Sequence, residues 1–82
     1  MSEEHRKHEI FVNGTPKHWD KDMISYAEVV DLAFPPPHKP NAIFTVQYSH
    51  GPPENPQGTL VSGQSVKVKS GMRFDVKQTI QS

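Results

Sequence analysis

The residues most able to do chemistry in this sequence are five histidines, at positions 5, 8, 18, 38 and 50. His5 and His8 have an i,i+3 spacing, but they belong to a polar N-terminal stretch that fixes no geometry. The other three fall in separate segments, without the spacing of a metal-binding motif and without a pair of carboxylates beside them. We therefore expect solvent-exposed histidines, no bound metal and no cofactor.

Nucleophilic and acid–base catalysis also lack a recognisable motif. The chain contains serines, threonines, histidines and aspartates, but it has no nucleophile elbow and no glycine-rich phosphate loop. A chain of 82 residues forms one domain at most, and it buries only about 60% of the surface that its unfolded form exposes. This leaves too little bulk for a deep catalytic cleft, so we expect that the protein is not an enzyme.

The composition excludes several classes of partner. Nine basic and nine acidic residues give a formal net charge of zero, so the broad basic field of a nucleic-acid-binding protein is missing. No apolar run approaches the ~20 residues of a membrane span, and the charged start lacks the apolar stretch of a secretory signal. The absence of cysteine excludes disulfides and thiolate metal sites. We expect a small cytoplasmic protein that binds neither nucleic acid nor membrane.

Alternating apolar and polar residues predict the strands. Residues 8–12 alternate, and Asn13-Gly14 directly after them is typical of a tight turn into a second, weaker strand that has Pro16 near its start and ends at Trp19. Residues 1–7 are polar with nothing to bury, so we expect a flexible N-terminal tail there. Later segments with a strand pattern are 41–48, two short pieces at 60–61 and 65–69, and a final strand at 72–77.

One helix is expected between the second and third strands. Ser25 and Glu28 match a capping box, in which each side chain satisfies a backbone amide of the first turn. Pro35-Pro36-Pro37 ends a helix of about ten residues, because proline lacks the amide proton that the helix needs. The segment 35–40 is either a stiff connection or a polyproline II ligand, and we favour the connection. The expected apolar helix face is Tyr26, Val29, Val30 and Ala33.

The order of elements predicts an α+β fold. A helix that follows a hairpin must cover one face of the sheet to bury its apolar side. The economical solution is a mixed sheet of four to five strands packed on one α-helix, which is the β-grasp architecture. It would cover residues 8–77, followed by a flexible C-terminal tail at 78–82. The expected inward residues are Ile10, Val12, Trp19, Ile24, Val29, Val30, Ala33, Phe44, Val46, Phe74 and Val76.

The opposite face of the sheet is the candidate binding surface. If Ile10 and Val12 point toward the helix, Phe11 points away from it. Such an aromatic is either a docking anchor or an ordinary exposed side chain, and the sequence favours neither. The same alternation places polar and charged residues on this face: Glu9, Thr45, Gln47, Arg73, Asp75 and Lys77.

Four short motifs follow one another in order: Ile10-Phe11-Val12-Asn13-Gly14, Trp19-Asp20-Lys21, Ile24-Ser25, and Gly71-Met72-Arg73-Phe74-Asp75-Val76. Together they resemble the bacterial multiubiquitin family of ubiquitin-like domains, over residues 8–79. The resemblance implies a β-grasp fold and a bacterial protein modifier that is conjugated to target proteins. It also implies an activating enzyme, a conjugating enzyme and a metal-dependent deconjugating peptidase as partners, in operons linked to antiphage defence.

The resemblance also assigns roles to individual residues. The outer sheet face is the usual partner surface of ubiquitin-like proteins, although Thr45 and Gln47 are polar where the patch of ubiquitin is apolar. The conjugation tail would carry its reacting carboxylate on Ser82. It has no terminal glycine to ease threading through an enzyme channel. The implied partner-binding residues are Phe11, Thr45, Gln47, Arg73 and Asp75, and the implied tail residues are Gln78, Thr79, Ile80, Gln81 and Ser82.

The missing glycines leave several explanations open. The cognate enzymes have a roomier channel, or a longer native chain is trimmed, or the protein is never conjugated. In the last case it would be a non-covalent adaptor that uses its sheet face or an edge strand. A further alternative is a domain that assembles with itself through the edges of its sheet.

Overall fold

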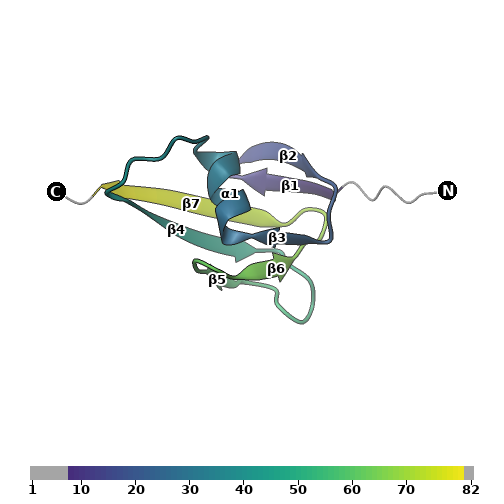
Figure 1. The fold of residues 1–82 in the computed structure, drawn as a ribbon. Helices are drawn as coiled ribbons and strands as arrows, with labels where there is room; N and C mark the ends of the chain where they lie inside the picture. The colour runs from purple at the N-terminus through teal and green to yellow at the C-terminus, as the bar shows by residue number, and fades with distance from the viewer. Residues whose placement is uncertain (1–7, 81–82) are drawn as a thin grey trace.

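The structure, a computed structural model, describes residues 8–80. Over these residues the chain forms seven strands and one helix, arranged as a five-stranded sheet, a two-stranded sheet and a helix that crosses one face of the larger sheet (Figure 1). In chain order the elements are β1 (His8–Val12), β2 (Thr15–Trp19), β3 (Met23–Ser25), α1 (Tyr26–Ala33), β4 (Ala42–Ser49), β5 (Gly58–Leu60), β6 (Ser65–Lys67) and β7 (Arg73–Ile80).

The larger sheet has the strand order β2-β1-β7-β4-β5 and is mixed. β1 and β7 run parallel, whereas the other neighbours pair antiparallel. The first and last strands of the chain therefore lie side by side in the middle of the sheet. This arrangement confirms the expected α+β fold, with a mixed sheet packed on one helix.

The β1–β2 hairpin forms as its turn residues predict. Asn13 and Gly14 have φ values of 52° and 82°, and positive φ at both central residues is what a tight type I′ turn requires. The return strand runs from Thr15 to Trp19 and has Pro16 near its start, as expected. Proline is tolerated there because β2 lies at the edge of the sheet, where one side of the strand needs no hydrogen-bonding partner.

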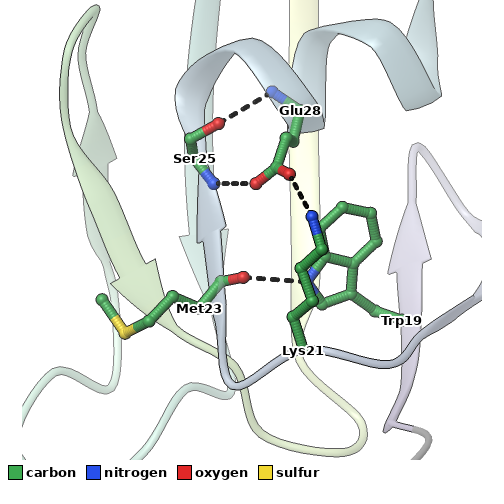
Figure 2. Close-up of polar contacts among 5 residues, drawn as sticks. All are labelled: Trp19, Lys21, Met23, Ser25 and Glu28. Carbon is green, nitrogen blue, oxygen red and sulfur yellow. Dashed lines mark hydrogen bonds and ion pairs between the residues drawn. The ribbon is translucent and has the colours of Figure 1, made fainter.

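The helix begins with the expected capping box. The backbone N–H of Glu28 donates to Ser25 Oγ (3.1 Å), and the backbone N–H of Ser25 donates to Glu28 Oε1 (2.9 Å) (Figure 2). The helix is shorter than predicted, with 8 residues, and Phe34 caps its C-terminal end before the prolines. Val29 and Val30 are its buried residues. The helix thus presents a narrow apolar side to the sheet.

The core lies between the helix and the sheet. Most of the expected inward residues are fully buried there, and Trp19, Ala33 and Phe44 pack against the core while remaining partly exposed. Four further core residues were not expected: Leu60, Val66, Val68 and Met72. Val66 lies in β6, which pairs with β3, a strand of three residues that the sequence analysis did not predict. β3 has no local signal, because its pairing partner is about forty residues away in the sequence.

The end of the last strand corrects one expectation. β7 continues to Ile80, and its residues Gln78, Thr79 and Ile80 pair with the start of β4. The flexible tail expected from Gln78 onward is therefore wrong for these three residues, because β4 begins early enough to give each of them a ladder partner. Gln81 and Ser82 lie outside the described residues, as does the expected N-terminal tail at 1–7. Between His8 and Ile80 no helix has the length and apolarity to span a membrane.

Candidate functional site

The candidate docking face is the side of the larger sheet that α1 does not cover. The strand register places Phe11 of β1 beside Arg73 of β7, and Gln47 of β4 beside Asp75 of β7. Thr45 lies two residues before Gln47 along β4, on the same face of the sheet. The five residues expected to bind partners therefore lie together on the adjacent strands β1, β7 and β4. Their role in binding remains a prediction.

Phe11 is not an isolated surface aromatic. The guanidinium carbon of Arg73 lies 5.4 Å from the centre of the Phe11 ring, within the range of a cation–π contact. Phe11 is half-buried and Arg73 is exposed. The ring thus lies against the Arg73 guanidinium, whose N–H donors have no hydrogen-bond or ion-pair partner among residues 8–80. Aromatic and arginine side chains concentrate binding energy at protein interfaces, so this pair is the strongest candidate anchor on the face.

A shallow hollow lies beside this pair. Its volume is about 310 Å³, and its polar lining comes from β4, β5, β7 and the loop before β5. Within the described residues, the Asp75 carboxylate forms no ion pair and no side-chain hydrogen bond, so it is free to accept donors from a partner. The sequence does not predict this hollow, because the pairing register of β5 with β4 cannot be read from local residues. Its lining residues are Gln47, Tyr48, Ser49, Gln57, Gly58, Thr59 and Asp75.

The Asn13 side chain joins the hairpin turn to β7. Its Nδ2 donates to the carbonyl oxygen of Val76 (3.1 Å), and its Oδ1 accepts from the backbone N–H of Val76 (2.8 Å). The backbone N–H of Asn13 also donates to the carbonyl oxygen of Phe74 (2.9 Å). The amide therefore extends the β1–β7 ladder past the end of β1 and helps to hold Phe11 in register with Arg73. We call these two side-chain bonds the Asn13 clamp.

A second cluster ties the β2–β3 connection to the helix. Trp19 Nε1 donates to the carbonyl oxygen of Met23 (2.9 Å), and Lys21 Nζ lies 5.4 Å from the centre of the Trp19 ring. Lys21 also forms an ion pair with Glu28 (3.1 Å) (Figure 2). The backbone N–H of Ser25, and then Lys21, hold the pKa of Glu28 below its ordinary value. This cluster supports the helix that covers the core.

Two of the histidines are not simply exposed. The His38 ring lies 5.0 Å from the Phe44 ring, and its Nε2 is 2.7 Å from the carbonyl oxygen of Phe34. His38 therefore caps the end of α1 and packs on the sheet. His8 Nε2 is buried without a hydrogen-bond partner, 3.8 Å from Asp22 Oδ1. For His8 the expectation of exposure is therefore wrong, whereas His38 remains exposed despite these contacts. Within residues 8–80 no three histidine, aspartate or glutamate side chains lie close enough to hold a metal ion.

The C-terminal half of β7 lies beyond the core. Gln78 and Ile80 are on the same side of the strand as the buried Phe74 and Val76, yet both are exposed. Ile80 keeps 43% of its surface accessible. In Figure 1, β4 and β7 extend together past α1 toward the C-terminal end. Of the expected tail residues, Gln78, Thr79 and Ile80 thus lie in a two-stranded extension of the sheet.

The central parallel β1–β7 pair, the mixed sheet and the single helix on one face define a ubiquitin-like β-grasp domain. A model of the multiubiquitin family matches residues 8–80, and the chain belongs to this family. The match confirms the resemblance carried by the four short motifs. Neither the curated proteins nor the solved structures give a match.

Proposed function

We propose that this protein is a ubiquitin-like modifier, a protein substrate that cognate enzymes attach to other proteins. An activating enzyme and a conjugating enzyme would handle it, a metal-dependent peptidase would remove it, and antiphage defence would be its setting. The observation that carries the proposal is the division of β7. Its first half belongs to the core and the docking face, while its second half is exposed and pairs with β4 alone.

The exposed half of β7 suits a segment that must be handed to an enzyme. Gln78, Thr79 and Ile80 contribute no buried side chain, so detaching them from β4 removes ladder hydrogen bonds without opening the core. Local opening of this kind costs much less than global unfolding. An activating enzyme could therefore draw the C-terminal end into its channel while the rest of the domain stays folded.

Activation and conjugation would require no catalytic group from this chain. The carboxylate of Ser82 would attack the α-phosphate of ATP, and pyrophosphate would leave as the acyl-adenylate forms. A thiolate of the enzyme would then displace AMP to give a thioester, which an amine of the target opens to form the amide. This chain has no cysteine, so the thiol must belong to its enzymes. The protein would act as a substrate and not as an enzyme.

The outer face would supply the specificity of these encounters. The Phe11–Arg73 pair offers an apolar ring and a planar cation side by side, and the hollow offers the free Asp75 carboxylate. A partner that matches these groups would contact β1, β7 and β4 together. Because the face holds both charges, it would select partners through complementary charge placement as well as apolar contact.

The direct test is charging by the cognate activating enzyme with ATP. We expect a thioester that reducing agent cleaves, and a chain whose C-terminal carboxylate is converted to an amide should form none. The Phe11→Ala variant is the control for the docking face: it should fold normally but charge more slowly. Equal charging of the amide-blocked chain would show that the carboxylate is not the reacting group.

A non-covalent adaptor is the second candidate, and the pairing of Gln78–Ile80 with β4 favours it. A segment held in a ladder is less available for threading than a free tail. The two candidates differ when residues 79–82 are deleted. For an adaptor, the deletion should leave partner binding unchanged while Phe11→Ala abolishes it. For a modifier, the deletion should abolish conjugation.

A further inference from the structure

Asn13 belongs to a chemically reactive Asn-Gly dipeptide, and its side chain also joins the hairpin turn to β7. It is followed by Gly14, both residues are exposed, and both have positive φ in the hairpin turn. A Cβ placed on Gly14 would meet no atom within 4 Å, so the turn is open on that side. At the same time, both polar atoms of the Asn13 amide are engaged by Val76. An exposed turn thus carries a side chain on which the centre of the sheet depends.

The Asn-Gly pair is chemically labile. When base removes its proton, the backbone nitrogen of the glycine attacks the side-chain carbonyl carbon of the asparagine, a new C–N bond forms and ammonia leaves. Water then opens the five-membered imide at either carbonyl, which gives aspartate or isoaspartate. Glycine favours this attack because no Cβ crowds its nitrogen. The other asparagines are poorer sites, because Asn41 precedes Ala42 and Asn55 precedes Pro56, whose nitrogen carries no proton.

We propose that Asn13 is a hydrolytic modification site that the clamp protects in the folded protein, and whose modification releases β1 from β7. The amide must rotate away from Val76 before the Gly14 nitrogen can reach its carbonyl carbon, because the two hydrogen bonds fix its orientation. Reaction in the native protein therefore proceeds only from the fraction of molecules whose hairpin is open.

The product cannot rebuild the clamp. An aspartate carboxylate has no proton to donate, so the Val76 carbonyl loses its partner and faces a negatively charged oxygen. The isoaspartate product also adds a carbon to the backbone of a two-residue turn. Either product loosens the end of the ladder that keeps Phe11 beside Arg73. The effect of modifying the Asn13 amide would thus extend to Phe11, which lies two residues away on the docking face.

The experiment compares modification of the native chain with that of the chain in urea, both at the same mildly alkaline pH. Mass spectrometry follows the replacement of the side-chain NH₂ by a hydroxyl and assigns it by peptide mapping. In urea we expect Asn13 to react faster than Asn41 and Asn55, which serve as internal controls. In the native protein the reaction at Asn13 should slow by at least about tenfold. Equal rates in the two states, or no preference for Asn13 in urea, would overturn the proposal.

The structural consequence has its own readout, the hydrogen exchange of the backbone amides of Phe11 and residue 13, which donate to the carbonyl oxygens of Met72 and Phe74 across the β1–β7 ladder. Their exchange should be faster in Asn13→Asp than in the wild type, and also faster in aged, modified protein. Unchanged exchange of both amides in Asn13→Asp would show that the modification leaves the ladder intact. If Asn13→Asp does not fold, the same exchange rates are compared between the modified and the unmodified molecules of aged native protein.

Discussion

The two halves of β7 have different surroundings, although they form one continuous strand. Arg73 and Phe74 pair with both β1 and β4, and Val76 is held by β4 on one side and by the Asn13 clamp on the other. The inward side chains of this half, Phe74 and Val76, are buried beneath the helix. Residues 77–80 pair with β4 alone, and all four are exposed. The backbone ladder is continuous, so the difference arises from the side chains and the helix. Burial, and not strand pairing, marks where the folded core ends.

This contrast assigns the halves different tasks. The first half aligns Arg73 and Asp75 on the docking face and is held from both sides, on one of them by the Asn13 clamp. The second half has little apolar surface to lose when it detaches from β4. A modifier needs both properties, because its enzymes must recognise a fixed surface and also take hold of a movable end.

The largest expected effect separates two residues on the same side of the strand. Phe74→Ala should lower the free energy of unfolding by about 3–5 kcal/mol, because it removes a fully buried ring from the core. Ile80→Ala should change the same quantity by no more than about 0.5 kcal/mol, as at other exposed positions. Urea unfolding of both variants measures the contrast. A comparable loss in Ile80→Ala would erase the distinction between the two halves.

Weakening the helix cap should lower the stability of the core that the helix forms with the first half of β7. Ser25→Ala removes the side-chain acceptor of the capping box, and such a change typically costs about 1 kcal/mol of stability. Ser25→Asp keeps an acceptor oxygen at the N-cap and should retain most of the stability, which makes it the matched control. Thermal unfolding checks both variants. If Ser25→Ala were as stable as the wild type, the cap would not help to hold the helix over Phe74 and Val76.

A smaller effect concerns acid. Ser25 and Lys21 hold the pKa of Glu28 below its ordinary 4.5, so the ionised side chain stabilises the folded state. That contribution is complete above pH 4.5 and is lost as the pH falls through the lower pKa of the folded state. Because Glu28 is partly exposed, we expect about 0.5 kcal/mol. The stability difference between wild type and Glu28→Gln should therefore shrink as the pH falls below 4.5. A stability difference between the two proteins that grows as the pH falls would contradict this prediction.

Local sequence signals were sufficient for much of the fold. Asn13-Gly14 predicts the hairpin, Ser25 with Glu28 predicts the start of the helix, and alternation predicts the strand that became β4. Each of these signals lies within a few residues of the structure it specifies. The outer-face position of Phe11 follows in the same way, from the alternation of β1.

The features that were missed depend on distant partners. β3 is a strand only because β6 pairs with it, and the end of β7 depends on where β4 begins. The Asn13 clamp joins residues 63 positions apart, and the hollow forms only when β4, β5 and β7 meet. His38 behaves similarly, because its position beside Phe44 depends on the path of the loop after α1.

Hydrogen exchange along β7 tests the central claim most directly. Under native conditions, we expect the amides of residues 73–76 to exchange only when the whole domain unfolds. The amides of residues 77–80 should exchange much faster, through local opening. This result would establish that the C-terminal segment can be released from a domain that stays folded. Equal protection of the two halves would contradict the claim, because the end of the strand would then be as firmly held as the core.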